Sequence, residues 1–222
     1  MENKRPLWEL FPELVEMVRQ DHTQRGVAGG GHDFLHALMV AQYGKLIAKN
    51  KRIGVLVWVA GICHNTDHLF PLLEIKGRLD SYLEITDLSA EEKWLVIEAV
   101  IEHSKLNDPR DNPVTIALKD ADRLANIGPN VFIRSGQFRP QLPTYDPFYV
   151  LTLDPESTFQ GPMSCLDDIK HCLEWEQWLR LPKAKELAIP YFKQLRIFIK
   201  GFARQLKEVD LLPYPFKAPK ER

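Results

Sequence analysis

The 222-residue chain carries 29 Lys and Arg against 30 Asp and Glu, a formal net charge of -1, and 45% of its residues are hydrophobic. This composition is typical of a globular protein with a substantial core, and it excludes nucleic-acid or membrane binding driven by bulk charge. Cys63, Cys165 and Cys172 form no CxxC pair, which favours a reducing compartment over a disulfide framework. Charges throughout residues 1–20 argue against a signal peptide, and no window is apolar enough to span a membrane. We therefore expect a cytoplasmic protein.

The N-terminal residues predict a helix and a loop. Apolar residues recur at helical spacing in the first segment, at Leu7, Leu10, Phe11, Leu14, Val15 and Val18. The sequence DHTQRGVAGGGHD interrupts this stripe, and its four glycines between Gly26 and Gly31 predict a flexible loop. The loop lacks the spacing of a phosphate-binding GxxxxGK(S/T) motif. Residues 33–50 predict the next helix, with Asp33 as a candidate N-cap.

The most informative stretch is residues 58–69, where an apolar run leads directly into His64, Asn65, Asp67 and His68. On one continuous helix, His64 and His68 stand one turn apart and Asp67 shares their face. A helix that is apolar on most sides is buried, and polar side chains at its end are unfavourable unless they are paired or bound to a metal. The cluster therefore favours a metal site over a helix end that merely reaches the surface.

The remaining segments also predict helices. A short helix is expected over residues 72–83, and Ser89 with Glu92 forms a capping box for a helix that ends near His103. Residues 114–127 predict another helix, which Gly128 and Pro129 should stop.

The C-terminal third begins with residues 141–161, a long segment rich in proline and aromatic residues. Loops of this length are usually functional or disordered, and the aromatic residues favour a lid or flap. A helix is expected from Ser164, and a last helix from Pro182 to Val209 should be kinked at Pro190.

No segment alternates like a strand, so we predict an all-α, single-domain helical bundle of seven to nine helices. Residues 1–30 would pack on the domain as an N-terminal helix and Gly-rich loop. Residues 31–210 would form the domain itself, and residues 211–222 a tail.

Three of the predicted helices present metal-type ligands from otherwise apolar faces. These are His36 on one helix, His64 with Asn65 and Asp67 on a second, and Asp120 or Asp122 on a third. Two imidazoles and one carboxylate from separate helices can hold a divalent ion and leave positions open for water and substrate. A mixed N/O set suits Mn, Fe, Co, Ni or Mg better than it suits a closed structural zinc site.

The order His, then His-Asx, then Asp resembles the HD-domain superfamily of metal-dependent phosphohydrolases. In particular it is similar to bacterial HD proteins with HDxxH and DADRL motifs, which here are residues 32–36 and 120–124. The EHS at residues 102–104 and the entry LPKAKELA to the last helix also look like that branch. The resemblance spans roughly residues 31–209. It implies an HD-type bundle with His36, His64 and Asp122 as metal ligands.

The chain departs from this family at one ligand, because the His-Asp doublet is His64-Asn65 here. Asparagine offers a carbonyl oxygen without charge, so the affinity for a divalent cation should fall. Three outcomes remain open: Asp67 supplies the missing carboxylate, Asn65 itself ligates, or the site has lost its metal. Since His36, His64 and Asp122 are all present, we expect the metal to be retained.

In such enzymes the ion polarises a phosphoryl oxygen and activates a bound water. The resemblance therefore implies hydrolysis of a small phosphorylated substrate, with a nucleotide as the leading candidate. Candidate catalytic residues are Asp67 and His68 as general acid or base, and Lys105 and Arg123 as sources of positive charge. Arg134 could also supply positive charge and is a candidate for contact with the substrate. Arg123 equally fits a structural ion pair with its neighbouring carboxylates.

Four further residues are candidates for contact with the substrate or for holding the ligand imidazoles: His32, Asp33, His103 and Asp120. His103, at the end of a predicted helix, equally fits a partner of the helix dipole. Two other functions stay open. One is a degenerate HD-domain protein that binds a nucleotide or phosphate without hydrolysis, and the other is a helical interaction protein with structural histidines. The sequence leaves homo-oligomerisation undecided.

Overall fold

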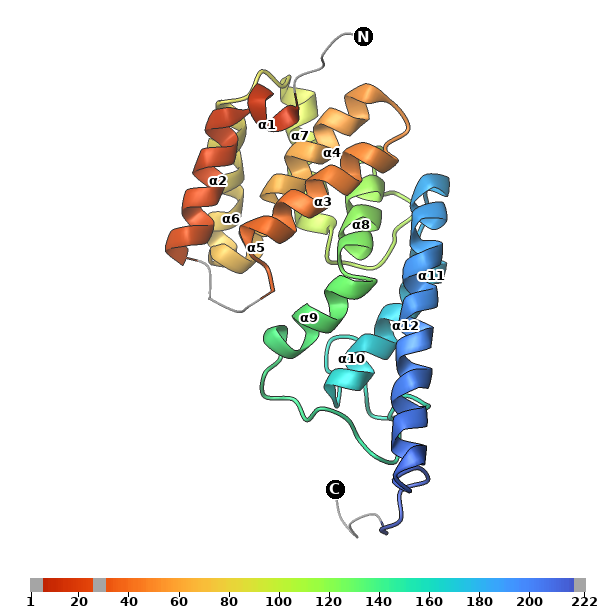
Figure 1. The fold of residues 1–222 in the computed structure, drawn as a ribbon. Helices are drawn as coiled ribbons and strands as arrows, with labels where there is room; N and C mark the ends of the chain where they lie inside the picture. Colours follow the sequence, from red (N-terminus) through yellow and green to blue (C-terminus); the bar gives the residue numbers. More distant parts are fainter. Residues whose placement is uncertain (1–5, 26–30, 218–222) are drawn as a thin grey trace. The chain divides into compact units, whose positions relative to one another are not determined.

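The computed structural model describes residues 6–25 and 31–217, and within these ranges every regular element is a helix (Figure 1). The all-α class predicted from the sequence is confirmed. Residues 26–30 of the predicted glycine loop lie outside the described part. The helices are α1 (Leu7–Leu10), α2 (Pro12–Arg25), α3 (Phe34–Ile47), α4 (Lys51–Cys63), α5 (Thr66–Leu69), α6 (Leu72–Glu84), α7 (Ala90–Glu102), α8 (Pro113–Ala125), α9 (Pro129–Phe138), α10 (Cys165–His171), the 3-10 helix η1 (Cys172–Glu174), α11 (Trp175–Trp178) and α12 (Pro182–Glu208).

The chain divides into two compact units. Unit 1 comprises Met1–Ala125 and Leu179–Lys185, and unit 2 comprises Asn126–Trp178 and Glu186–Arg222. Helix α12 therefore begins in unit 1 and continues in unit 2. The predicted division into residues 1–30, 31–210 and 211–222 stays a prediction.

Helix α4 is the central helix of unit 1 and packs against α3, α7 and α8 (Figure 1). Its apolar run is buried along most of its length, including the whole side chain of Trp58, as expected for a helix that is apolar on most sides. Helices α3 and α4 approach closely at Gly61, where a Cβ atom would lie 2.7 Å from the Cα of Ala41. Only glycine fits there. This contact sets the spacing between the helices that carry His36 and His64.

Side-chain caps fix where the helices of unit 1 begin. Oδ1 of Asp33 accepts the backbone N–H of His36 at 2.7 Å, which confirms Asp33 as an N-cap of α3. Asn50 caps α4 in the same way, and Ser89 with Glu92 makes the predicted capping box of α7. Each cap satisfies N–H groups that the first helical turn leaves without a partner.

Several boundaries differ from the sequence prediction. Helix α2 continues to Arg25 instead of ending before Asp21. Residues 58–69 are not one helix, because α4 ends at Cys63 and the short α5 starts at Thr66. Helix α9 was not predicted; Gly128, with φ of 74°, turns the chain before it, and proline suits a first helical position. With twelve α-helices and one 3-10 helix, the described residues exceed the seven to nine predicted.

Unit 2 contains a small apolar core of Val150, Leu166, Ile199, Ala203 and Leu206. The long segment between α9 and α10 is held by contacts within this unit. Oγ of Ser157 lies 3.0 Å from Nε2 of His171, and Nδ1 of the same imidazole lies 2.8 Å from Oε1 of Glu174. The segment is thus tied down by packing and hydrogen bonds, and its predicted role as a lid stays a prediction.

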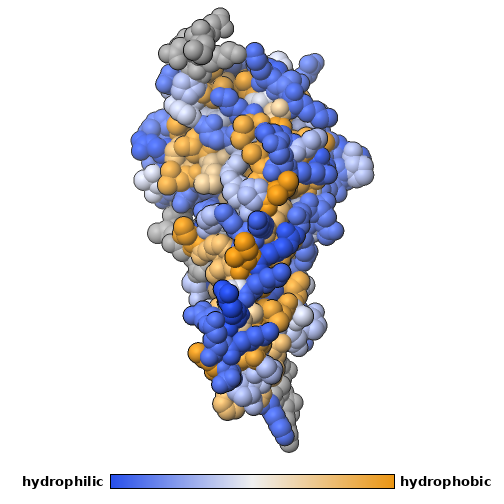
Figure 2. Space-filling view, turned by 45° about the vertical axis from the view of Figure 1, so that its right-hand side comes forward, coloured by the Kyte–Doolittle hydropathy of each residue, from blue (hydrophilic) through white to orange (hydrophobic). Residues whose placement is uncertain are grey.

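The surface carries scattered apolar side chains. Figure 2 shows them on one face as separate patches among hydrophilic residues. Exposed examples on α12 are Ile189, Ile197 and Phe198. Single apolar side chains are a normal part of protein surfaces and imply no partner. None of the helices within residues 6–25 and 31–217 is long and apolar enough to cross a membrane.

Candidate metal centre

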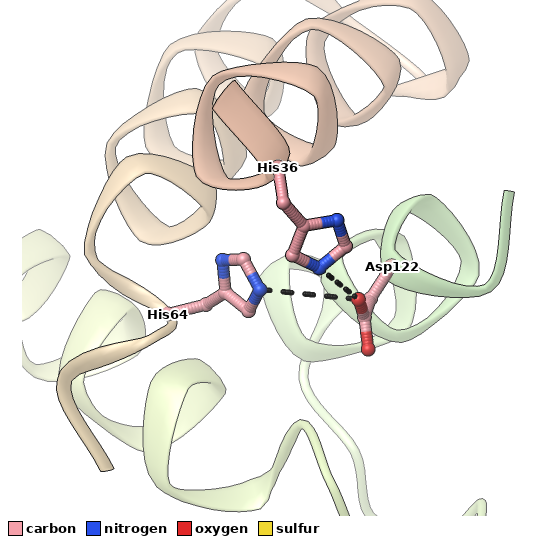
Figure 3. Close-up of side chains that lie close together, drawn as sticks. All are labelled: His36, His64 and Asp122. Carbon is pink, nitrogen blue, oxygen red and sulfur yellow. Dashed lines mark ion pairs between the residues drawn. The ribbon is translucent and has the colours of Figure 1, made fainter. Parts of the chain in front are cut away.

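His36 lies in the first turn of α3 and is buried. The hydrogen bond from its backbone N–H to Asp33 fixes this turn at the start of the helix. Nε2 of His36 lies 3.2 Å from Oδ1 of Asp122 on α8. Figure 3 marks this ion pair with a dashed line. Helices α3 and α8 pack against each other, so this contact joins two segments that are far apart in the sequence.

His64 is the C-cap residue of α4 and is almost fully buried. Its Nδ1 lies 2.7 Å from the backbone oxygen of Gly61. A carbonyl oxygen can only accept, so Nδ1 carries the proton and Nε2 keeps a lone pair. This Nε2 is buried and has no hydrogen-bond partner among the described residues. The end of α4 therefore orients the His64 ring so that Nδ1 faces the helix backbone and Nε2 is left as the candidate ligand atom.

The two imidazoles converge on one carboxylate. Oδ1 of Asp122 lies 3.2 Å from Nε2 of His36 and 3.8 Å from Nε2 of His64 (Figure 3). One ligand atom from each residue lies within 4.8 Å of the other two. Within the described part of the chain, this is the only group of three or more His, Cys, Asp and Glu side chains arranged in this way. The structure thus brings together the three residues for which the sequence predicted metal ligation.

The electrostatics of this group favour a cation. Burial lowers the pKa of His64 well below its usual value of 6.5, although the Asp122 carboxylate opposes this shift. Burial alone would raise the pKa of Asp122, but the hydrogen bond with His36 and the surrounding imidazoles lower it below its usual value. A neutral imidazole lone pair and an ionised carboxylate oxygen therefore face each other. Both are acceptors, and a bound cation would satisfy them together.

Asn65 follows His64 and is completely buried. Its Nδ2 lies 3.3 Å from the backbone oxygen of Asp33 and 3.3 Å from Nε2 of His22. Because the backbone oxygen can only accept, the side-chain nitrogen must face it, and this fixes the orientation of the amide. Oδ1 of Asn65 is buried and has no hydrogen-bond partner in the described residues. It is a fourth candidate donor atom, and it is neutral.

Further imidazoles surround the three central residues. His103, the C-cap residue of α7, directs its Nδ1 to the backbone oxygen of Val100 at 2.6 Å, and its ring meets that of His64 edge-on with centroids 5.3 Å apart. His32 meets the ring of His36 edge-on and stacks on His68. His32 and His103 therefore contact the imidazoles of the candidate ligands His36 and His64, and their role in holding these rings stays a prediction.

Asp67 and His68 lie on α5 and are paired with each other, with His68 Nε2 3.8 Å from Asp67 Oδ1. Asp67 does not belong to the group of three ligand side chains. The physical reason is the break between α4 and α5, since Asp67 shares a helix face with His64 only if the helix is continuous. The prediction of one continuous helix through these residues was wrong, and their common face stays a prediction.

The other predicted site residues have visible structural partners. Asp120 accepts the backbone N–H groups of Arg180 and Leu181 at 2.9 and 2.7 Å and lies 3.5 Å from Arg123. It thus fixes residues 179–185 to α8. Arg123 is buried in this ion pair, which agrees with its structural interpretation.

Two predicted cationic residues lie in other surroundings. Lys105 forms an exposed ion pair with Glu102 at 2.7 Å. Arg134 belongs to unit 2, where its guanidinium contacts the side chain of Asn126. Their roles toward a substrate stay predictions.

His22 lies at this centre although the sequence did not indicate it. It contacts Asn65 from α2, 43 positions earlier in the chain. Nδ1 of His22 lies 2.8 Å from the backbone oxygen of Val18, four residues earlier. This spacing was the local signal for the position of the ring. A lone histidine at such a spacing is common and gives no sign of the long-range contact.

No protein-family model and no curated protein matches the sequence. Solved structures do resemble the chain. A Lactobacillus plantarum protein has a TM-score of 0.71 at 17% identity, over 90% of this chain and 98% of that one. Bacillus subtilis YpgQ in complex with ADP has a TM-score of 0.62 at 19% identity, over 88% and 97%. An HD-superfamily hydrolase from Bacillus thuringiensis has a TM-score of 0.67 at 17% identity, over 91% and 99%.

At these identities the likeness establishes the fold. The chain adopts the helical architecture of an HD-superfamily hydrolase, and the predicted HD-type fold is confirmed. Together with the buried His36 and His64 and the half-buried Asp122, this fold provides a site with the donor set of a divalent metal centre.

Proposed function

We propose that the chain is a metal-dependent phosphohydrolase that cleaves a phosphate or pyrophosphate bond of a small phosphorylated substrate, in particular a nucleotide. The observation that supports this most is Nε2 of His64. It is a buried lone pair without a hydrogen-bond partner in the described residues, 3.8 Å from an oxygen of Asp122. Such an arrangement is unfavourable without a cation.

His36, His64 and Asp122 would hold the ion, and Oδ1 of Asn65 would add a fourth, neutral donor. This mixed set of nitrogen and oxygen donors suits Mn, Fe, Co, Ni or Mg. When bound, a divalent ion polarises a phosphoryl oxygen and makes its water more acidic. The backbone contact of His64 fixes its tautomer, so the chain presents a preformed ligand atom.

Proton transfer is assigned to the exposed pair on α5. The side chains of His68 and Asp67 are 40% and 30% exposed, so both can reach solvent and a bound substrate. Asp67 orients the His68 ring, which exchanges a proton with the attacking water or with the leaving group. His68 lies next to the ligands through its stack on His32.

The nucleotide assignment draws on the likeness to YpgQ, whose structure contains ADP. Since phosphoryl transfer depends mainly on positioned positive charge, the ion itself would supply most of it at this centre. Lys105 is the proposed source of further positive charge, because its side chain is exposed and its ion pair with Glu102 lies at the surface, where it can be broken at little cost in free energy.

A second candidate function is nucleotide binding without hydrolysis. The neutral Asn65 favours it, because a site with one carboxylate holds a divalent ion more weakly than a site with two. In that case the ion, or the imidazoles alone, would serve to bind phosphate.

The test uses protein stripped of metal with a chelator and then supplied with Mn, Fe, Co, Ni or Mg. Nucleoside mono-, di- and triphosphates and p-nitrophenyl phosphate serve as substrates. We expect metal-dependent turnover of a nucleotide, lost in Asp122→Asn. Bound metal and bound nucleotide without turnover of any compound would support the second candidate.

A further inference from the structure

His22 lies near the end of α2, with its ring edge-on to Phe34 at a centroid distance of 5.9 Å. Its Nδ1 lies 2.8 Å from the backbone oxygen of Val18. Since that oxygen can only accept, Nδ1 carries the proton and Nε2 is an acceptor.

The amide of Asn65 supplies the donors that match this acceptor. Its Nδ2 carries two N–H groups, and two acceptors lie within 3.3 Å: Nε2 of His22 and the backbone oxygen of Asp33. Both N–H groups are therefore used, and the amide cannot rotate without losing them. What remains is Oδ1, a buried acceptor with no hydrogen-bond partner in the described part of the chain.

We propose that His22 is a positioning residue of the metal centre, which together with the backbone of Asp33 fixes Asn65 so that its oxygen acts as a neutral ligand. This inference rests on the proposed function. Asp33 contributes twice, because its side chain caps the turn that carries His36 while its carbonyl oxygen holds Asn65. His22 touches no candidate ligand atom and acts only through the amide.

The same contacts account for asparagine in place of aspartate. A carboxylate in this orientation would turn an oxygen toward Nε2 of His22 and toward the carbonyl oxygen of Asp33. Two hydrogen bonds would become two contacts between acceptors, in a buried place where such contacts are most unfavourable. The surroundings thus select a neutral side chain at position 65.

The test is a comparison of Mn²⁺ binding by isothermal titration calorimetry in the full chain. His22→Phe keeps a ring against Phe34 and removes the acceptor, and Asn65→Ala removes the amide. We expect His22→Phe to weaken Mn²⁺ binding about tenfold, as for other residues that orient a ligand. In a protein that already carries Asn65→Ala, His22→Phe should weaken Mn²⁺ binding no further. His22→Gln, whose amide oxygen can accept from Asn65, should restore binding.

Urea unfolding of the metal-free variants separates a structural role from a positioning role. A His22→Phe variant that is less stable but binds Mn²⁺ like the wild type would overturn the inference and leave the proposed function intact. If His22→Phe weakened Mn²⁺ binding equally in the wild type and in Asn65→Ala, the positioning role of His22 would be overturned as well. A wild-type protein that binds no Mn²⁺ would overturn the metal centre and this inference together. If His22→Phe fails to fold, a tenfold loss of Mn²⁺ binding in His22→Gln would contradict it.

Discussion

The imidazole rings of His32 and His68 stack with centroids 3.8 Å apart and planes inclined by 19°. His32 also meets the ring of His36 edge-on at 5.7 Å, so the stack connects an exposed imidazole to a candidate ligand. His68 itself pairs with Asp67 and is 40% exposed. This places the His68 imidazole beside the candidate metal centre but outside its three candidate ligands, which is where a proton donor or acceptor would be needed.

Replacement of His68 by alanine is therefore expected to lower kcat by about 10²-fold or more, because a general acid or base is lost. The dissociation constant of Mn²⁺ should stay unchanged. Steady-state kinetics with Mn²⁺ and a nucleotide substrate, combined with calorimetry, measure both quantities. An unchanged kcat would remove His68 from the mechanism, and a loss of Mn²⁺ binding would make it a ligand instead.

The close contact of α3 and α4 gives a second prediction. Gly61→Ala places a Cβ atom 2.7 Å from the backbone of Ala41, so the two helices must separate. We expect a loss of about 1–3 kcal/mol in the free energy of unfolding, together with weaker Mn²⁺ binding because His36 and His64 move apart.

Gly54→Ala on the same helix is the matched control. The nearest atom to its added Cβ is the backbone oxygen of Lys45 at 3.5 Å, an ordinary contact. This variant should keep or gain stability, by up to about 1 kcal/mol from helix propensity. Urea unfolding measures both variants, and equal stabilities would show that the close approach at Gly61 is unimportant.

A third prediction concerns the buried ion pair of Asp111 and Lys119. Nζ of Lys119 lies 2.9 and 3.0 Å from the two carboxylate oxygens, and the two side chains are 4% and 1% exposed. Burial would raise the pKa of Asp111, but the Lys119 hydrogen bonds and those from other donors lower it below 3.8. Its stabilising contribution is thus fully present above pH 3.8 and is lost as the pH falls through the lower value of the folded state.

Asp111→Asn should destabilise the chain by about 3–5 kcal/mol at pH 7, since it leaves the Lys119 ammonium buried without a counter-charge. As the pH falls below 3.8, the free energy of unfolding should decrease less in Asp111→Asn than in the wild type. Urea unfolding between pH 3 and pH 7 tests this. A parallel decline of both proteins in acid would show that Asp111 does not contribute to the acid sensitivity.

The His171 ring lies between the Ser157 hydroxyl and the Glu174 carboxylate, an arrangement that resembles a serine, histidine and acid catalytic triad. Two contacts favour a structural tie instead. The Met163 N–H donates to Oγ of Ser157 at 3.3 Å, and the N–H after the serine, a usual oxyanion donor, is bound to Gly161.

We therefore expect that Ser157→Ala makes residues 141–161 more susceptible to limited proteolysis, because a tether of the segment is lost. Wild-type Ser157 should not react with a fluorophosphonate probe. Labelling of Ser157, detected by peptide mass spectrometry, would contradict the structural assignment.

The sequence predicted the parts of this molecule that depend on local pattern. Ser89 caps α7 as its spacing to Glu92 indicated, and α6 matches its predicted range to within one residue. His36, His64 and Asp122 were found through motifs whose spacing places each on its own helix, and packing of apolar faces brings those helices together.

The structural features that the sequence did not predict depend on contacts between segments that are distant in the chain. The apolar pattern through residue 62 gives no sign that the helix ends at Cys63, so the interruption between α4 and α5 was not predicted. The hydrogen bond between His22 and Asn65 crosses 43 positions. Only the packing of α2 against α4 and α5 reveals it.

A calorimetric titration of metal-free protein with Mn²⁺, repeated with Asp122→Asn, tests most directly whether His36, His64 and Asp122 bind a metal ion. We predict a saturable site in the wild type and at least about tenfold weaker binding in the variant, because the only carboxylate of the group loses its charge. Binding should also raise the melting temperature, since the site exists only in the folded chain. No binding by the wild type, or equal binding by both proteins, would contradict the account.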